Sequence, residues 1–569
     1  MKLVLGVFAS ALVCVSGAAG ALQSGKTPAA PTGLHAFVYR ADEAVKPDHT
    51  YALMPAFAWN ATQGANRYEL QLATSASFSD ATTLYEQTYV APVASIQLQV
   101  PWMTGKPYAL WVHVRVIKHG HTSAWSSPFG FNTAWQEVPQ QLPAPNGLIR
   151  WSTIEGATAY EVWFQNVPGN YQTHFTTLTN VADEREYWTF HPADATSIRW
   201  RIRAVRLVTT ASLPNGIHVV NYGPYSPVYV TPTTPNLFPG RLQEVSAASD
   251  VDSTPETTRP HQLTPGFTWT GTQDALANGA NAQLWRVYVF SDKECVNPVM
   301  AGSIVGGPAW APRELAPLAM PGTVQELLDF ESGKFPGYAP QANAFGADGV
   351  PPTPAESGGL APTSSGTPAP PDGSSSFTTG TALRTISLPD NGWPQGRYWW
   401  TVVPVNIYRV VTDPLKGPSA GDKLEYHDAS LPQDLCAAGQ VWPFGMQSAP
   451  VTTISETPYA SGLINGTRVV SAAGLKPSFQ ELPLITWQPA LAADSYEIQL
   501  SRQAYPWVAV RSQTSVVTST VLPLTKHDLG VWYYRVRGVN PNLSGPGQKL
   551  AWSRPVAVRI SGDHFIVIK

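Results

Sequence analysis

Charged residues are scarce in this chain. Asp, Glu, Lys and Arg together make up 13% of its 569 residues, and the formal net charge is −3. Proteins that bind nucleic acids or anionic membranes by electrostatic attraction gather Lys and Arg on one surface. The nearly neutral composition therefore argues against both classes of partner. The length exceeds what one hydrophobic core can use and predicts about three to five domains.

Long apolar stretches are lacking except at the start of the chain. An apolar run over residues 3–15 follows Lys2, and the small residues 16–21 follow that run. This order predicts a secretory signal peptide over residues 1–21, cleaved near Ala21. A membrane anchor is the alternative, although the run is short for a span. Because no later stretch reaches about 18 apolar residues, we expect a mature chain without a transmembrane segment, either secreted or associated with the cell surface.

Motifs of common enzyme classes are also missing. The sequence has no Gly-x-Ser-x-Gly elbow, no phosphate-binding Gly-rich loop and no His-Glu-x-x-His helix. A pair of carboxylates that meets only in space can still cleave a glycosidic bond, and a sequence does not reveal such a pair. We predict a protein that is not an enzyme and that takes no cofactor.

The chain does contain a repeat. Three times a strand-like segment with Trp is followed nine residues later by Tyr-Glu and further apolar alternation: Trp59 with Tyr68, Trp151 with Tyr160, and Trp487 with Tyr496. In a fourth copy, Trp269 is followed by Trp285 after sixteen residues. The alternation around a turn-like centre predicts two antiparallel strands with a tight connection. Because each such ring buries on the order of 150–250 Å², we expect these residues to face the core.

Two further elements follow each copy in the same order. The second is an alternating strand at residues 110–116, 198–205, 398–405 and 532–539, and the third is a short exit with proline at residues 125–128, 225–227, 448–450 and 552–555. Period two predicts which side chains face inward in two of these strands: Ile198, Trp200, Ile202, Ala204, Trp532, Tyr534 and Val536. The same register predicts that Arg199, Arg201, Arg203, Arg535 and Arg537 face solvent.

Together the three elements resemble the fibronectin type III module, particularly the versions strung along secreted bacterial proteins. The resemblance implies an all-β chain of four tandem immunoglobulin-like β-sandwiches. We place module 1 at 31–135, module 2 at 136–232, module 3 at 233–455 and module 4 at 456–569. If the modules act as spacers and binding surfaces of an interaction protein, we expect an elongated shape and independently folding units.

Module 3 is too long for one sandwich of roughly 100 residues. We assign the excess to two irregular insertions, at about 308–380 and 414–440. Residues 349–380 are rich in Pro, Gly and Ser, a composition typical of disorder. Before them, the apolar pattern of residues 323–331 predicts a short amphipathic helix.

Cysteine is rare, with three residues in the chain, and only Cys295 and Cys436 lie beyond the predicted signal peptide. In an oxidising compartment such a pair predicts one disulfide, with two free buried thiols as the alternative. Cys295 aligns with Phe78 of module 1. A bridge would close a loop of about 140 residues, for which the chain-entropy model gives roughly 4–5 kcal/mol.

Three groups of side chains have the chemistry of metal ligands but lack parts of a site. They are His113, His119 and His121; Asp250, Asp252 and Glu256; and Asp183, Glu184 and Glu186. The histidines have no nearby Cys or carboxylate in sequence, and the second group lacks the glycine of a calcium loop. We interpret them as turn histidines, a solvated linker and a charged loop, and predict no metal site.

Several of the twenty tryptophans lie outside the three repeated elements. Four are candidates for stacking against a ligand: Trp163, Trp188, Trp393 and Trp507. The alternative is that such residues fill contacts between modules. The leading prediction is a secreted, non-catalytic structural or interaction protein whose partner is a protein or polysaccharide at the cell surface or matrix. A carbohydrate-binding accessory protein, and a hydrolase with its site in the module 3 insertions, are the alternatives.

Overall fold

The structure is a computed structural model. It describes residues 27–37, 48–144, 147–167, 172–177, 180–184, 197–209, 218–232, 242–248, 266–271, 284–305, 309–311, 322–331, 396–411, 413, 415–446, 448, 450–451, 462–464, 467–470, 478–479, 484–490, 493–525, 527–539 and 549–560. The predicted signal peptide, the Pro/Gly/Ser-rich segment 349–380 and the acidic group at 250–256 lie outside these residues.

Module 1 is a sandwich of two sheets. The smaller has the order β1-β3-β6 and the larger the order β2-β9-β7-β4-β5, with β8 paired to β7. Its strands are β1 His35–Phe37, β2 Thr50–Tyr51, β3 Ala56–Ala58, β4 Arg67–Ala73, β5 Thr83–Tyr89, β6 Val93–Ser95, β7 Leu110–Lys118, β8 His121–Thr122 and β9 Phe129–Thr133. Phe57 from the smaller sheet and Leu70 and Val112 from the larger share one buried cluster, so the core lies between the two sheets.

Module 2 repeats this plan with a longer hairpin in its larger sheet. The sheets have the orders β10-β11-β14 and β13-β12-β15-β16, and β17 also pairs with β15. The strands are β10 Gln141–Leu142, β11 Leu148–Trp151, β12 Ala159–Val167, β13 Gln172–Thr177, β14 Val181–Asp183, β15 Ser197–Thr209, β16 His218–Tyr225 and β17 Tyr229–Pro232.

Module 3 has the same two sheets and also carries helices. The orders are β18-β19-β22 and β21-β20-β23-β24, with β25 paired to β23. The elements are β18 Leu242–Ala248, β19 Gly266–Gly271, β20 Leu284–Phe290, β21 Pro298–Val305, β22 Ala309–Trp310, α2 Val324–Glu331, β23 Gly396–Val410, β24 Lys423–Asp428, α3 Pro432–Ala437 and β25 Trp442–Met446. The helix predicted at 323–331 is confirmed as α2. The second insertion is more ordered than predicted, because it contains β24 and α3.

Module 4 pairs a two-stranded sheet, β29-β32, with a sheet of order β26-β27-β28-β34-β33-β30-β31. The strands are β26 Gly462–Ile464, β27 Thr467–Val470, β28 Ser478–Phe479, β29 Leu484–Thr486, β30 Ser495–Ser501, β31 Arg511–Ser515, β32 Ser519–Val521, β33 Gly530–Val539 and β34 Val556–Ile560. Val451, ahead of the predicted boundary, is buried in this module's core. The predicted fold class, an all-β chain of four β-sandwiches, is confirmed.

The Trp–Tyr spacing of the repeat has a direct structural meaning. In modules 1, 2 and 4 the Trp and Tyr rings meet edge to face, with centroids 5.2–5.6 Å apart. Each tyrosine hydroxyl also accepts a backbone N–H from the turn between the two strands, from Thr62, Ile154 or Ala490. One tyrosine therefore fills the core and satisfies a turn donor that would otherwise be buried without a partner.

The serine of the exit element also has a fixed role. Ser126, Ser226 and Ser553 each accept a backbone N–H from the neighbouring strand of their own module, at 2.9–3.1 Å. In module 3 the Ser448 hydroxyl accepts the N–H of Ala551 in module 4 at 2.6 Å. The exit of module 3 is therefore part of the junction with the next module.

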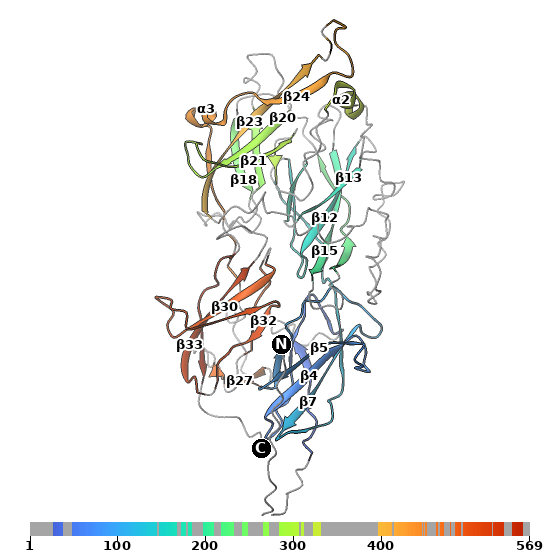
Figure 1. The fold of residues 1–569 in the computed structure, drawn as a ribbon, viewed down its shortest axis with the longest axis vertical. Helices are drawn as coiled ribbons and strands as arrows, with labels where there is room; N and C mark the ends of the chain where they lie inside the picture. Colours follow the sequence, from blue (N-terminus) through green and yellow to red (C-terminus); the bar gives the residue numbers. More distant parts are fainter. Residues whose placement is uncertain are drawn as a thin grey trace, which may run out of the picture.

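The modules do not form the elongated shape expected of spacer modules. The chain runs through modules 1 and 2 on one side and returns through modules 3 and 4 on the other (Figure 1). Modules 1 and 4 meet through their smaller sheets, where Ala58 and Val93 pack against Leu484. Period two explains this contact, because Phe57 faces the module 1 core while Ala58 faces outward toward module 4. The predicted elongated shape is wrong.

Polar side chains fix the register between modules 1 and 4. The hydroxyls of Ser95 and Ser519 lie 2.8 Å apart. The Gln97 amide accepts the Ser515 hydroxyl and the Val516 N–H, and donates to the Ser519 carbonyl. Because these bonds use the backbone of a turn, they require one defined relative position of the two sheets.

Modules 2 and 3 meet in the same manner, through Leu148 and Val181 on one side and Ala309 and Ala311 on the other. The Asp183 carboxylate accepts the Ala311 N–H at 2.6 Å across this contact. Asp183 and Glu184 are buried, so the predicted charged loop is wrong. Glu186 lies outside the described residues.

The junction of modules 1 and 2 is filled by Trp102, which belongs to module 1 but is buried in the module 2 core. The buried Arg206 guanidinium donates to the carbonyls of Val100 and Gly156, at 2.7 and 2.8 Å. Gly156 has φ +81°, and a Cβ there would lie 2.5 Å from the Ala52 carbonyl oxygen. Trp102 thus confirms, at one position, that tryptophans outside the repeat fill contacts between modules.

Candidate ligand-binding surface

The outer faces of the larger sheets carry stacks of rings and guanidinium groups. In module 1, the His113 ring lies between Phe78 and Trp125, with centroids 3.5 and 3.7 Å away. Its Nε2 is 2.8 Å from Gln71 Oε1. Burial, and after it the charge of Arg115, lowers the pKa of His113 to about 4, so the imidazole is neutral at neutral pH.

The other two histidines of the candidate metal group lie apart from this stack. His119 and His121 are exposed at the turn between β7 and β8, as the interpretation as turn histidines requires. His113 does not fit that interpretation, since it lies buried within β7. In the part of the chain that the structure describes, no three His, Cys, Asp or Glu side chains gather in a way that would hold a metal ion.

Module 2 buries the arginines that period two places outside. Arg201 lies 3.8 Å over the Tyr225 ring and Arg203 lies 4.0 Å over the Tyr222 ring. The Arg203 guanidinium also pairs with the buried Glu161 carboxylate. Their side chains do point to the outer face, but the Tyr222 and Tyr225 rings of the neighbouring strand β16 cover them. The predicted exposure of Arg201 and Arg203 is therefore wrong, although the predicted inward set of this strand is buried as expected.

Trp163 is also covered by Tyr225. Its side chain is 1% exposed and packs against Tyr225 and Val228. A ring buried in this way presents no face to a sugar or a protein, so the prediction that Trp163 stacks against a ligand is wrong. Two further candidates, Trp188 and Trp393, lie outside the described residues and stay predictions.

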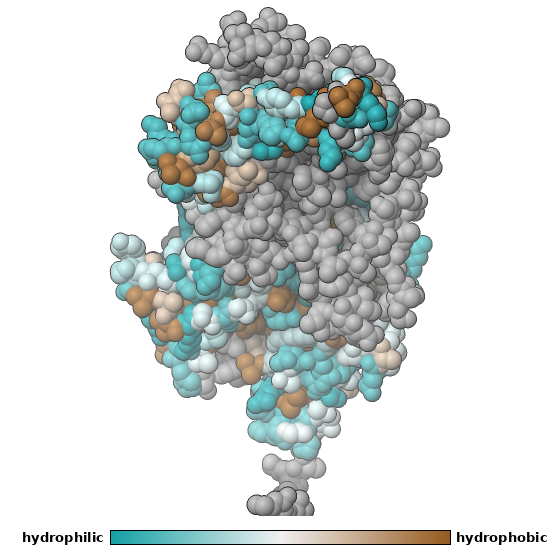
Figure 2. Space-filling model, turned by 45° about the horizontal axis from the view of Figure 1, so that its top comes forward, coloured by the Kyte–Doolittle hydropathy of each residue, from teal (hydrophilic) through white to brown (hydrophobic). Residues whose placement is uncertain are grey.

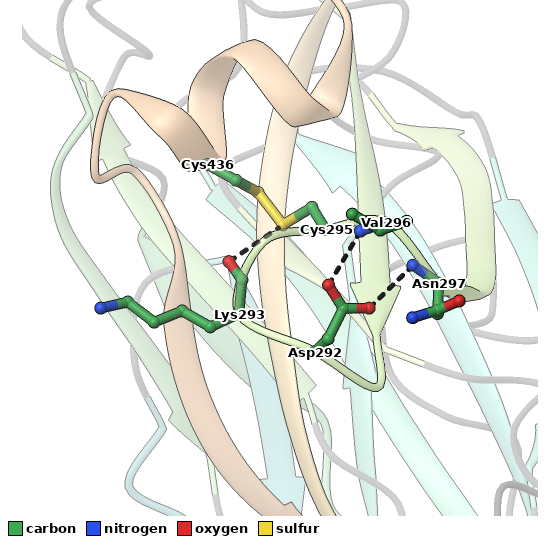
Figure 3. Close-up of a disulfide and its surroundings, with 6 residues drawn as sticks. All are labelled: Asp292, Lys293, Cys295, Val296, Asn297 and Cys436. Atoms are coloured by element: carbon green, nitrogen blue, oxygen red, sulfur yellow. Dashed lines mark hydrogen bonds between the residues drawn. A yellow bond between two sulfur atoms is a disulfide. The ribbon is translucent and has the colours of Figure 1, made fainter.

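Module 3 has a disulfide on its larger sheet. Cys295, in the turn after β20, is bonded to Cys436 of α3, with their Cα atoms 6.2 Å apart (Figure 3). The predicted bridge is confirmed and the free-thiol alternative is wrong. In the same turn the Asp292 carboxylate accepts the N–H groups of Val296 and Asn297, which lower the pKa of Asp292.

Phe78 and Cys295, which align in sequence, also share a backbone conformation. Both have positive φ angles, 49° and 59°. In module 1 the residue at this position stacks on a ring of the sheet, and in module 3 it forms a covalent bond to α3. The equivalent turn is thus held over the larger sheet by ring stacking in module 1 and by a disulfide in module 3.

Module 4 contains a similar stack and the last ligand candidate, Trp507. The Arg535 guanidinium lies 4.4 Å from the Trp507 ring and 4.1 Å from the Trp552 ring, and Arg537 lies 4.1 Å from Trp552. Trp507 Nε1 donates to Gln499 Oε1 at 3.1 Å. Because Trp507 is half-buried as an end member of this stack, it retains partial exposure. The predicted exposure of Arg535 and Arg537 holds only in part, since both are half-buried.

The residues next to Trp507 are the ones that the sequence reasoning missed. Tyr505 is 91% exposed, and Val508, Val510 and Leu529 are each more than half exposed. The available signal was local: the connection at 502–510 carries several apolar side chains where a turn normally carries polar ones. This arrangement presents an aromatic and aliphatic surface beside the exposed Arg502.

Comparisons with known proteins add little to this description. A scan against protein-family models gives no match, and a search of curated protein sequences gives none. Among solved structures, the chain is similar to the FN1–FN3 domains of chicken CNTN1, with 14% sequence identity over 51% of this chain and 90% of that chain, and a TM-score of 0.17. The β-sandwich assignment therefore depends on the sheet topology described above.

Proposed function

We propose that this chain is a secreted, non-catalytic protein that works outside the cell or at its surface, where its four sandwich modules form one block that presents binding surfaces to partners. The proposal includes a relationship to the fibronectin type III modules of secreted bacterial proteins. The contacts between modules support the block, since modules 1 and 4, and modules 2 and 3, share buried side chains.

The observation that carries the proposal is the distribution of exposed apolar side chains. Among the described residues, most of the large ones gather in two places. One is the hairpin of β23 and β24, with Ile407, Tyr408, Val410 and Leu415, and the other is the end of module 4 with Tyr505. On the face shown in Figure 2, hydrophobic residues form separate small patches among hydrophilic ones. Concentrated apolar groups on a folded surface are typical of protein contact sites.

Export is tested by expressing the full chain in a bacterial host with a secretion pathway. N-terminal sequencing of the protein from the medium or cell surface should find a mature chain that begins near residue 22. A chain that stays in the cytoplasm with its first residues intact would contradict the proposal. No helix in the described residues is long and apolar enough to cross a membrane.

The two alternative functions stand differently. The carbohydrate-binding alternative can no longer use Trp163, which is buried. Trp507 and the neighbouring Tyr505 remain available as a stacking surface. The hydrolase alternative rests on both insertions of module 3, and the first lies largely outside the described residues, so it stays a prediction. A substrate screen of the full chain, with glycosides, esters and peptides, should give no turnover; turnover that tracks with the chain through purification would contradict the non-catalytic proposal.

A further inference from the structure

The end of module 4 carries five exposed residues, which we call the Tyr505 patch: Arg502, Tyr505, Val508, Val510 and Leu529. Four of these lie on the connection from β30 to β31, and Leu529 immediately precedes β33. The Arg502 guanidinium donates to the Leu529 carbonyl at 2.9 Å, so the connection and the start of β33 lie side by side. The apolar members are between 51% and 91% exposed.

The backbone that carries the patch is held by internal hydrogen bonds. The Ser501 hydroxyl donates to the Gln503 carbonyl, and the Gln503 amide donates to the Pro506 carbonyl, both at 2.8 Å. The Trp507 indole donates to Gln499, and the Val510 N–H donates to the Leu500 carbonyl. An apolar surface on an ordered loop loses little conformational entropy when a partner binds, which favours its use as a contact site.

Arg502 gives the patch a charge. Its guanidinium lies 3.7 Å over the Trp532 ring, and no carboxylate of the described residues forms an ion pair with it. Nearby Arg511 differs, because both of its Nη atoms bond the Asp528 carboxylate, at 3.0 and 2.7 Å. The patch therefore combines apolar groups with one exposed cation that is free to meet a carboxylate of a partner.

We propose that the Tyr505 patch binds a protein segment that presents apolar side chains next to Asp or Glu. Tyr, Trp and Arg are the residue types that contribute most at the centres of protein interfaces. Sugar rings need hydrogen-bonding groups around the stacking ring, whereas Val508, Val510 and Leu529 offer none from their side chains. The inference rests on the proposed function as an interaction protein and names the surface and the class of partner.

The test uses the full chain and two pools of labelled twelve-residue peptides. In one pool Leu, Phe or Tyr alternates with Asp or Glu, and in the other the same apolar residues alternate with Lys or Arg. Fluorescence anisotropy should show at least about tenfold tighter binding of the acidic pool, a difference worth about 1.4 kcal/mol. Binding of the acidic pool should weaken as salt is raised, because an exposed charge contributes to it.

Variants connect the binding to the patch. Tyr505→Ala should weaken binding of the acidic pool at least tenfold, and Arg502→Gln should remove the preference for acidic peptides. Arg502→Lys keeps the charge and should keep the preference. Val90→Ala, in module 1, removes an exposed apolar side chain outside both apolar surfaces and should change nothing. Because these side chains are exposed, circular dichroism should show unchanged folding for all four.

Several results would overturn the inference. They are equal binding of both pools, binding that survives Tyr505→Ala, and absence of peptide binding altogether. Binding of insoluble cellulose, chitin or mannan that Tyr505→Ala abolishes would assign the patch to glycans instead. Each of these leaves the export and non-catalytic parts of the proposed function standing, because those parts are measured by N-terminal sequencing and by turnover.

Discussion

The contact between modules 1 and 4 can be tested with a covalent trap. The Ser95 and Ser519 hydroxyl oxygens lie 2.8 Å apart in a buried site, although the two residues are 424 positions apart in sequence. Cysteine at both positions places two sulfurs close to bonding distance, since a disulfide needs about 2.05 Å between sulfurs. We expect Ser95→Cys with Ser519→Cys to oxidise to an intramolecular disulfide in a glutathione redox buffer.

The effect on stability follows from the size of the closed loop. The chain-entropy model gives about 20 cal/mol/K for a loop of 424 residues, or about 6 kcal/mol at 25 °C, while engineered bridges typically deliver 2–4 kcal/mol. We therefore expect an increase of about 2–6 kcal/mol in the free energy of unfolding of the joined modules. Urea unfolding of the oxidised double variant, compared with the unchanged chain under the same oxidising conditions, measures it, and peptide mapping by mass spectrometry identifies the bridge.

A matched control uses two other buried serines of the same modules. Ser126 and Ser553 occupy equivalent exit positions, and each bonds only a strand of its own module in the hydrogen bonds described above. Ser126→Cys with Ser553→Cys should keep two free thiols. If the Ser95/Ser519 pair also stays reduced, or bridges only between molecules, then modules 1 and 4 do not meet in solution and the reasoning fails.

Three further predictions concern single modules. Because the pKa of His113 is lowered to about 4 from its usual 6.5, the stability of module 1 should be complete above pH 6.5 and fall as the pH drops toward 4; His113→Gln should flatten this dependence in thermal melts. Glu161→Gln leaves the buried Arg203 without its carboxylate and should destabilise module 2 by about 3–5 kcal/mol in urea titrations, whereas a loss below about 1 kcal/mol would show that the pair is solvated. Cys436→Ser should destabilise module 3 by up to about 5 kcal/mol, and reductant should no longer change its melting.

Features within one module were predictable because their causes are local. The spacing from Trp151 to Tyr160 sets a hairpin in which one ring packs on the other and the hydroxyl bonds the turn, so the sequence pattern contains the whole arrangement. The inward set of β15 follows from period two for the same reason. The pairing of Cys295 with Cys436 was predictable because no other partner exists after the predicted signal peptide.

Other features depend on what covers a face, and periodicity does not contain that information. Alternation places Arg203 on the outer face of its sheet, but whether solvent or Tyr222 lies over it depends on the side chains of the next strand, β16. In the sequence Asp183 looks like part of a charged loop. In the fold its carboxylate accepts the Ala311 N–H of module 3, a contact that local sequence does not contain. The one local hint of such contacts is the pair of small residues, Ala56 and Ala58, on a face that would normally be polar.

The 424-residue separation between Ser95 and Ser519 also determines how long module 1 exists before module 4 during synthesis. A ribosome that adds about 5–20 residues per second completes module 1 roughly 20–85 s before the module 4 strand that covers it exists. During that interval the face with Ala58 and Val93 is available to any other chain. The small size of these side chains limits how much apolar surface is exposed while the chain grows, so the same alanines that permit close contact in the folded block also reduce the risk of aggregation before it forms.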